Sequence, residues 1–486
     1  MVSSSVIVER EEYGPTVVIN EHEKKLGKSQ ILAVYVGYCF LLIFGHIAEL
    51  FSRLVIKKQH RGRLWVESSE SFYRRRFYSR TADRFNTPIF SMPGTWVSAK
   101  TQMVNPLLGN VMQKTKPVTL LNLGSYNYLD LVGNEKCVQS SMETLLDVGV
   151  SPCMYYGSSF LKTKEVYQLE QKVANFVGKE SAIVCGQGFA TNSGLLTALF
   201  QEKDLLLSDS LNHASLVCGM RRSAAKIECF EHNNFEQLER LLRAGILSCR
   251  YQRIWVIVEG IYSMEGEILQ LPAFMALKEK YKFFLFIDEA HSIGSLGSNG
   301  RGVCEYHGVD PSNVEVLMGT FTKSFGSVGG YVAADASLID YISYHGEATT
   351  QCPVMSSVSA RQAYEAFCFL ETSAGKERIA CAVRNANYFR SELEERGFFC
   401  IGSRDSLVVP VMLYHPGKIA AFGREAMKRG LACVTVGYPA VPLLLGRVRF
   451  CLSAGHTMDE LKWCIERIDE VGELCDIKYG LKGARV

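Results

Sequence analysis

A regular alternation of short apolar runs with segments of helical length constrains the fold of this chain most strongly, from about residue 119 to 345. The apolar runs cover residues 181–185, 205–208, 226–230, 254–259, 283–288, 316–320 and 330–334. Segments of helical length, such as 235–244 and 272–281, separate most of them. Strands interleaved with helices predict an α/β fold in which helices cover both faces of a mostly parallel sheet.

Polar side chains gather where the expected strands end. They are Ser208, Asp209, Asn212, His213, Glu259, Ser263, Asp288, His291, Thr320 and Lys323. Ligands of such sheets bind beyond the carboxyl ends of the strands, so we expect these residues to share one site.

Two of these residues, Lys323 and Asp288, indicate the chemistry. Lys323 lies in the turn GTFTKSFG, residues 319–326, and Asp288 follows a fully apolar run. A lysine can form a Schiff base with pyridoxal phosphate, and a carboxylate can hold the pyridine nitrogen protonated. The alternatives are a surface lysine and an aspartate that caps a helix. The apolar neighbours Phe321 and Phe325 favour the covalent cofactor site.

Three further residues can contact the cofactor ring. His213 can stack its imidazole on the ring, or it can be an ordinary histidine at the start of a helix. His291 follows Asp288 by three residues and can bond to the ring hydroxyl. Ser263 can help to fix the ring, or it can be a polar loop residue.

The sequence CGQGFATN, residues 185–192, follows one strand and opens a helix. Glycines there allow backbone amides to approach a phosphate at the positive end of the helix, although a lone GxG often serves only a turn. The expected phosphate-binding residues are Gly186, Gln187, Gly188 and Phe189, with hydroxyl groups from Thr320 and Thr322.

The N-terminal 63 residues differ from the rest. Residues 29–48 form a run of twenty without a charged side chain, which is long enough to cross a bilayer as a helix. More basic residues follow this run than precede it, which predicts a cytosolic catalytic part. An in-plane helix, a buried helix and a signal peptide are the alternatives. Residues 64–118 are expected to be a connecting amphipathic region.

Residues 346–486 are expected to form a smaller α/β domain, after a large cofactor domain over 119–345. It contains an expected strand at 407–413, a helix near 420–429 and a helix at 457–474. In the run RVRFCLS, Arg447 and Arg449 share one face of a strand. An arginine there can bind an amino-acid carboxylate, or it can lie on a solvated edge strand.

Composition narrows the class of partner. The net charge of +3 is too small to indicate a nucleic-acid partner, and 47% hydrophobic residues suffice for a large core. The sixteen cysteines show no metal-ligand spacing, so we expect reduced thiols and no metal site.

Several motifs together resemble the α-oxoamine synthase family of fold-type I pyridoxal phosphate enzymes. They are SLNHAS (210–215), VEGIYSMEGEI (258–268), IDEAHSIGSLG (287–297), GTFTKSFGSVGGY (319–331) and RVRFCLSAGHT (447–457), with NLGSYNYLD (122–130) in agreement. The resemblance covers about residues 70–480. Within that family, the chain is similar to the catalytic long-chain-base subunits of the serine palmitoyltransferase branch.

The resemblance implies a role for each site residue. Lys323 would be the covalent lysine and base, His213 the stacking residue, Asp288 the partner of the pyridine nitrogen, His291 and Ser263 ring contacts, Thr320 a phosphate contact and Arg449 the serine-carboxylate residue. It further implies condensation of L-serine with a long-chain acyl-CoA such as palmitoyl-CoA. The implied assembly is a heterodimer with a lysine-lacking subunit, possible small regulatory membrane subunits, and attachment to the endoplasmic reticulum membrane.

The chain departs from the family pattern at three places. Residues 149–169 lack the usual arginine and histidine, 348–352 replace a hydroxyl-bearing stretch, and Gly437 stands where a second arginine occurs in bacterial enzymes. These differences affect acyl-substrate access and dimer contacts more than the central chemistry. The alternatives are an aminolevulinate, aminooxononanoate or ketobutyrate synthase, and a non-catalytic membrane scaffold of the same fold.

Overall fold

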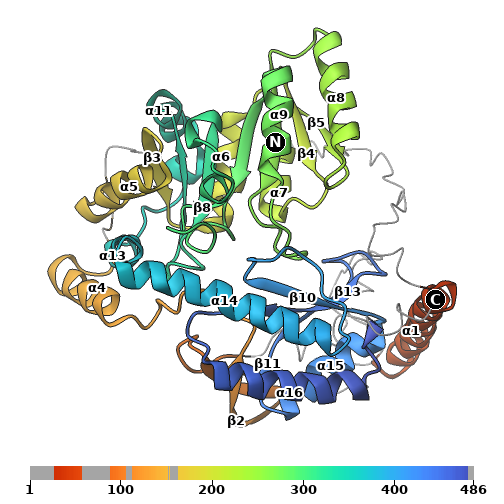
Figure 1. The fold of residues 1–486 in the computed structure, drawn as a ribbon. Coiled ribbons are helices and arrows are strands. Elements are labelled where there is room, and N and C mark those ends of the chain that lie inside the picture. Colours follow the sequence, from red (N-terminus) through yellow and green to blue (C-terminus); the bar gives the residue numbers. More distant parts are fainter. Residues whose placement is uncertain (1–26, 57–87, 105–111, 152, 154–161, 480–486) are drawn as a thin grey trace.

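All seven strands expected in the middle of the chain form one sheet (Figure 1). The structure is a computed structural model that describes residues 27–56, 88–104, 112–151, 153 and 162–479. The strands are β3 (Ser181–Cys185), β4 (Asp204–Asp209), β5 (Lys226–Phe230), β6 (Arg253–Glu259), β7 (Phe284–Asp288), β8 (Val316–Thr320) and β9 (Gly330–Ala334). Their order is β3-β9-β8-β7-β6-β4-β5, and β9 alone among them runs antiparallel to its neighbours.

Helices cover both faces of this sheet, as the fully apolar strands predict. Strand alternation sends Leu285 and Ile287 of β7 into one buried cluster and Phe286 into another. The covering helices are α5 (Lys164–Val177), α6 (Gly188–Leu199), α7 (Ala214–Arg222), α8 (Phe235–Leu247), α9 (Leu271–Tyr281), α10 (Val303–His307), α11 (Ala336–His345) and α12 (Glu347–Thr350). The expected α/β fold is confirmed.

A second unit lies below the large sheet in Figure 1. Its antiparallel sheet has β13 (Gly446–Cys451) between β10 (Val408–Tyr414) and β12 (Val434–Val436). The helices α4 (Glu135–Val148), α13 (Ser357–Leu370), α14 (Ser373–Glu395), α15 (Pro416–Lys428) and α16 (Met458–Leu474) complete the lower half. Because β13 is central, Arg447 and Arg449 are buried, and the alternative of a solvated edge strand is wrong.

The expected connector, residues 64–118, contains strand structure. β1 (Trp96–Val104) and β2 (Met112–Asn122) pair with each other, and β2 also pairs with β11 (Leu431–Ala432). The described part of this segment therefore contains paired strands, and residues 64–87 and 105–111 lie outside the described ranges. The partner of β2 is distant in sequence, so local periodicity could not indicate it. The division into domains stays a prediction.

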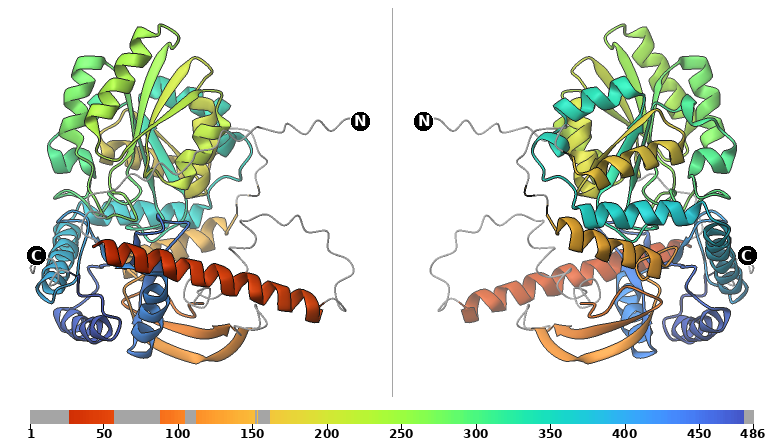
Figure 2. Two further views of the ribbon diagram at one scale, coloured as in Figure 1. Left: turned by 90° about the vertical axis from the view of Figure 1, so that its right-hand side faces the viewer. Right: turned by 90° about the vertical axis from the view of Figure 1, so that its left-hand side faces the viewer.

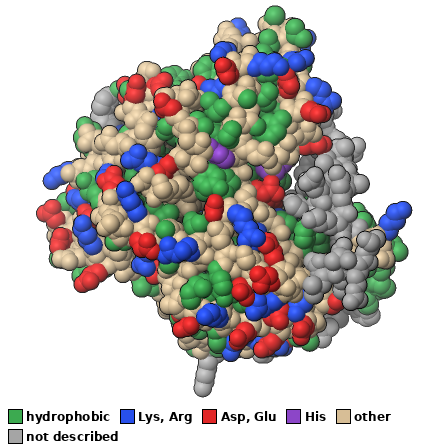
Figure 3. Space-filling model, in the orientation of Figure 1, with side chains coloured by type: hydrophobic (Ala, Val, Ile, Leu, Met, Phe, Trp, Pro, Cys, Tyr) green, Lys and Arg blue, Asp and Glu red, His purple; other side chains and the backbone are tan. Residues whose placement is uncertain are grey.

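Helix α1 (Lys28–Ile56) contains the expected apolar segment and runs beside the lower unit (Figure 2). One stripe is docked, with Val34 and Tyr38 packed in a cluster that includes Met412 and Tyr414. The opposite side exposes apolar side chains, among them Leu32, Phe40, Ile43, Phe44 and Ile47. Elsewhere the surface is mixed, since acidic and basic side chains intersperse over the lower part of Figure 3.

Candidate active site

Lys323 is held by the aromatic residues of its own turn. β8 ends at Thr320, and the next residue, Phe321, is completely buried. Phe325 is also buried and stacks on Phe367, with ring centroids 4.0 Å apart. Lys323 lies half-buried between these anchors, and its Nζ donates to Thr320 Oγ1 at 3.3 Å. The apolar flanks seen in the sequence therefore fix the lysine at the carboxyl end of β8.

The Asp288 carboxylate is buried at the end of the neighbouring strand β7. Its oxygens accept hydrogen bonds from the Asn192 amide nitrogen at 2.8 Å and from the Ala290 backbone N–H at 2.9 Å. Both donors are neutral, and no residue in the described ranges forms an ion pair with Asp288. A buried carboxylate with only neutral donors is suited to a cationic ligand group.

Burial lowers the pKa of Lys323 to about 8, although the carboxylates of Asp288 and Glu259 oppose the change. About a tenth of an amine with that pKa is neutral at pH 7, against far less than a hundredth for an ordinary lysine. A neutral amine is required both for nucleophilic attack and for accepting a proton. The lysine is thus prepared for covalent and acid–base chemistry.

His213 caps α7, because its Nδ1 accepts a hydrogen bond from the Ser215 backbone N–H at 3.2 Å. The histidine is therefore a helix-start residue, but its ring stays exposed near Phe189, with centroids 6.2 Å apart. Partial desolvation and the charge of Lys323 lower the pKa of His213, against the opposing charge of Asp288. A neutral ring on the surface of the site can still stack on a planar ligand.

His291 lies deeper in the same region and is buried. Its Nδ1 is 2.8 Å from the Tyr128 hydroxyl, and its ring meets the edge of Tyr126 at 5.3 Å between centroids. Burial, followed by the charges of Lys323 and Arg449, holds the pKa of His291 well below its usual value. His291 is therefore a neutral hydrogen-bonding group.

The expected phosphate anchor forms the start of α6. Gln187 is the N-cap residue but makes no side-chain cap hydrogen bond, so the first-turn amides have no capping side chain. A Cβ at Gly188 would lie 3.1 Å from Thr320 Cγ2, so glycine lets the helix start approach β8 closely. Gly186 directly follows β3, and Thr322 is exposed within the turn that carries Lys323. This arrangement suits an anion at the positive end of a helix.

Arg449 joins the site from the second unit. Its Nη1 donates to the Ser263 carbonyl at 3.1 Å, and its Nη2 donates to the Tyr126 hydroxyl. The guanidinium carbon lies 4.9 Å from the Tyr126 ring centroid, and Lys323 Nζ lies 5.8 Å from the same centroid. Arg449 is 3% exposed, and its Nε has no hydrogen-bond partner among the described residues. No described side chain provides an anionic partner for this cation, and a substrate carboxylate would provide one.

Two residues near the expected cluster are directed elsewhere. Arg447 shares a strand face with Arg449 but forms an ion pair with Glu265 at 3.1 Å. Asp209 ends β4 but bonds to His232 at 2.9 Å. Proximity in sequence to a site residue did not decide which side chains enter the site.

Three site residues were not predicted individually. Tyr126 lies between Arg449, Lys323 and His291, Tyr128 holds His291, and Asn192 holds Asp288. Asn192 falls four residues after Gly188, one helical turn into α6, which was the available signal. The two tyrosines lie in the motif at 122–130, whose approach to the sheet edge is not local.

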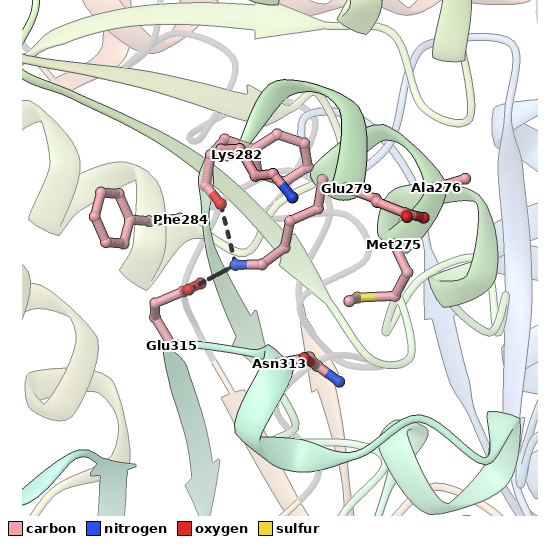
Figure 4. Close-up of a pocket in the computed structure, with 9 residues that line it drawn as sticks. Met275, Ala276, Glu279, Lys282, Phe284, Asn313 and Glu315 are labelled. Carbon is pink, nitrogen blue, oxygen red and sulfur yellow. Dashed lines mark hydrogen bonds and ion pairs between the residues drawn. The ribbon is translucent and has the colours of Figure 1, made fainter.

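A pocket of about 650 Å³ lies at the amino ends of the strands, opposite the candidate active site (Figure 4). Phe284 and Glu315 mark the amino ends of β7 and β8 there. Lys278 Nζ donates to a Glu315 oxygen at 2.6 Å and to the Phe283 carbonyl at 3.0 Å. Lys278 and Glu315 in this pocket are already paired with each other, in contrast to Lys323 and Asp288.

The groups at the carboxyl ends of the strands fit pyridoxal phosphate. Asp288 can face a protonated pyridine nitrogen, the uncapped start of α6 suits a phosphate, and Lys323 supplies the amine. Fold and site together define a pyridoxal phosphate-dependent transferase.

Comparison with known proteins supports this class. Residues 118–468 match the family model for aminotransferase class I and II. The chain is 41% identical to serine palmitoyltransferase 2 of Dictyostelium discoideum, covering 94% of this chain and 97% of that protein. It is 40% identical to serine palmitoyltransferase 3 of Homo sapiens, covering 92% and 84%.

A solved structure described as serine palmitoyltransferase with a pyridoxal phosphate internal aldimine superimposes with a TM-score of 0.74. It is 25% identical, covering 84% of this chain and 98% of that one. The chain therefore belongs to the class I and II aminotransferase family, on the branch of serine palmitoyltransferase and long chain base biosynthesis proteins.

Proposed function

We propose that this chain condenses L-serine with palmitoyl-CoA or a similar long-chain acyl-CoA. The products are 3-ketodihydrosphingosine, CoA and CO2, in the first step of sphingolipid synthesis. The position of Arg449 carries the proposal, because its buried guanidinium, whose Nε has no partner among the described residues, lies against the same Tyr126 ring as the amine of Lys323. An amino-acid carboxylate satisfies that guanidinium and brings the serine Cα toward Lys323.

Each side chain has a part in holding the cofactor and the substrate. Asp288 would accept a hydrogen bond from the protonated pyridine nitrogen, His213 would stack on the ring, and His291 and Ser263 would contact its polar groups. The amides of residues 186–189 and the hydroxyls of Thr320 and Thr322 would bind the phosphate. Pyridoxal phosphate supplies an electron sink that stabilises negative charge at the substrate Cα.

Lys323 is the group that moves the proton. Its Nζ, with a pKa lowered to about 8 chiefly by burial, accepts the proton from serine Cα. The carbon then forms a bond to the thioester carbonyl carbon, the carbon–sulfur bond breaks, and CoA leaves as a thiolate that takes a proton from water. The serine carboxylate leaves as CO2, and Lys323 returns its proton to the same carbon. Arg449 holds that carboxylate until it departs, and the buried surroundings of Lys323 and Asp288 limit access of water.

The proposed reaction is tested by incubating the protein, with a lysine-lacking partner subunit, with serine and acyl-CoA of different chain lengths. Formation of a 3-keto long-chain base from serine and palmitoyl-CoA supports the proposal. Turnover of glycine with succinyl-CoA or acetyl-CoA instead, or of alanine with pimeloyl-CoA, would assign the chain to another α-oxoamine synthase. No cofactor absorbance and no turnover would support a scaffold.

We further propose that α1 attaches the chain to the endoplasmic reticulum membrane with the catalytic part in the cytosol. The segment Lys28–Ile47 is apolar and long enough for a membrane helix, and 17% of its most apolar 18-residue stretch is buried. Side chains such as Phe40 (56% exposed) and Ile43 (54% exposed) need an apolar cover that lipid provides.

Deletion of residues 1–56 should move the protein from the membrane to the soluble fraction. Protease protection of an N-terminal tag separates a spanning helix from one in the membrane plane. Recovery of the full-length protein in the soluble fraction would contradict membrane attachment.

A second proposed contact is with a lysine-lacking subunit, with small regulatory membrane subunits as further partners. The outer side of α4 and the residues after it expose apolar side chains: Met142, Leu145, Leu146, Val148 and Val150. Leu146, 86% exposed, lies within this group of exposed apolar side chains, and such a group marks a surface for a partner. Leu146→Glu should abolish co-purification with the partner, and Leu247→Glu, on α8 and 81% exposed, is the matched control.

A further inference from the structure

The loop that carries Ser263 is held from both units of the molecule. It turns tightly, since the Gly266 backbone N–H donates to the Tyr262 carbonyl at 2.8 Å and Tyr262 N–H donates to the Glu267 carbonyl at 3.0 Å. Gly266 has φ +67°, and a Cβ there would lie 2.5 Å from the Val408 carbonyl of β10. The loop therefore touches the second unit through its backbone.

Glu265 extends the contact to the second unit. Arg447 Nη1 donates to a Glu265 oxygen at 3.1 Å and to the Met264 carbonyl at 2.8 Å, while its Nε donates to the Leu445 carbonyl at 2.9 Å. Arg447 is 1% exposed and Glu265 is 8% exposed, so water does not screen the pair. Buried ion pairs of this kind add little net stability but define one geometry.

Glu267 extends toward the large sheet. Its carboxylate lies 3.1 Å from His232 Nε2, while His232 Nδ1 lies 2.9 Å from Asp209 at the end of β4. Tyr262 donates its hydroxyl to the same Asp209 oxygen at 3.1 Å, and its ring lies 4.3 Å from that of His232. Burial opposes a charge on His232, but the hydrogen bonds to Asp209 and Glu267 raise its pKa to about 10.

The two carboxylates thus hold one short loop from opposite sides. Arg449, two residues after Arg447 on β13, donates to the Ser263 carbonyl in that same loop. The Ser263 carbonyl and the Tyr126 hydroxyl are both anchors of the Arg449 guanidinium. A displaced loop would withdraw one anchor and let the guanidinium rotate.

We propose that Glu265 and Glu267 are positioning residues that hold the Ser263 loop between the two units and so aim Arg449 at the carboxylate of the amino-acid substrate. This inference rests on the proposed role of Arg449 in serine binding. It assigns a task to the second half of the motif at 258–268, whose acidic residues do not reach the reacting atoms themselves.

The test uses the full chain with Glu265→Gln and Glu267→Gln, which keep side-chain shape and remove charge. Glu239→Gln is the matched control, because Glu239 bridges Lys280 and Arg243 on the surface of the same unit. We expect Glu265→Gln to raise the KM for serine about tenfold and Glu267→Gln about threefold, as weakened hydrogen bonds predict. The KM for palmitoyl-CoA in these two variants, and both KM values in Glu239→Gln, should change less than about twofold.

Hydrogen exchange in cofactor-free protein gives a second readout that does not depend on activity. Amides of residues 262–267 should exchange faster in both variants, with the strands of the large sheet unchanged. An unchanged KM for serine, or equal increases in both KM values with faster exchange throughout the chain, would overturn the proposal. If Glu265→Gln does not fold, Glu267→Gln decides alone. A wild-type protein that is inactive with serine would refute the proposed reaction. Hydrogen exchange of residues 262–267 would still test whether Glu265 and Glu267 hold the loop.

Discussion

The large sheet has a lysine close to carboxylates at two places: at the amino ends of its strands (the amino edge) and at their carboxyl ends (the carboxyl edge). The two lysines have different roles. At the amino edge, Lys278 is paired with Glu315, whose carboxylate also accepts the Leu285 backbone N–H at 2.6 Å. At the carboxyl edge, Lys323 has a single hydrogen bond, to Thr320, and Asp288 has only neutral donors in the described structure. Paired charges hold each other in one geometry, whereas unpaired buried charges are ready to bind a ligand.

The largest expected effect comes from replacing each of the two lysines, Lys323 and Lys278, by alanine in turn. Lys323→Ala should lower turnover of serine and palmitoyl-CoA by about 10³-fold or more, because the covalent amine and base are lost together. Lys278→Ala should keep turnover within about threefold and destabilise the protein by about 1–3 kcal/mol, since Glu315 loses its partner. Steady-state turnover and denaturant unfolding measure both. Equal activity losses in the two variants would remove the distinction between the edges.

The carboxylates should differ in the same way. Asp288→Asn should lower turnover by about 10²-fold, because a neutral amide cannot stabilise a protonated pyridine nitrogen. Glu315→Gln should leave turnover unchanged and lower the unfolding midpoint. Full activity of Asp288→Asn, with its cofactor absorbance intact, would exclude Asp288 from the site.

Arg449 tests whether an unpaired charge predicts a substrate contact. Arg449→Lys keeps the charge but loses the planar fork, so the KM for serine should rise about 30-fold, equivalent to about 2 kcal/mol. The KM for palmitoyl-CoA serves as the internal control. A larger change in the acyl-CoA value than in the serine value would place the carboxylate elsewhere.

The sequence predicted the sheet and its reactive edge well because both depend on local pattern. Alternating apolar runs located β3 to β9, and the ends of β7 and β8 located Asp288 and Lys323. It did not predict the reversal of β9, the pairing of β2 with β11, or the insertion of Tyr126 between Arg449 and Lys323. Each of these depends on partners far apart in sequence. Strand periodicity alone did not separate Arg447 from Arg449. The family resemblance favoured Arg449, and in the structure Arg447 forms an ion pair with Glu265.

The smallest expected effect is a pH dependence at the carboxyl edge. Burial places the pKa of Lys323 near 8, below the usual 10.5 of lysine. The rate at which cofactor-free protein binds pyridoxal phosphate covalently should therefore rise with pH and level off above about pH 8. The burial penalty on the charged amine persists below pH 8 and disappears between pH 8 and 10.5, so the Lys323 contribution to stability rises over that window. A rate that still climbs tenfold from pH 9 to 10 would indicate an ordinary lysine.

The most direct measurement of the central claim follows carboxyl-labelled serine and palmitoyl-CoA in the purified protein with its partner subunit. Our account predicts that labelled CO2, free CoA and 3-ketodihydrosphingosine form in equal amounts with pyridoxal phosphate present. All three should disappear in Lys323→Ala and persist in Lys278→Ala. Labelled CO2 without acyl-CoA, or product formation by Lys323→Ala, would contradict the account.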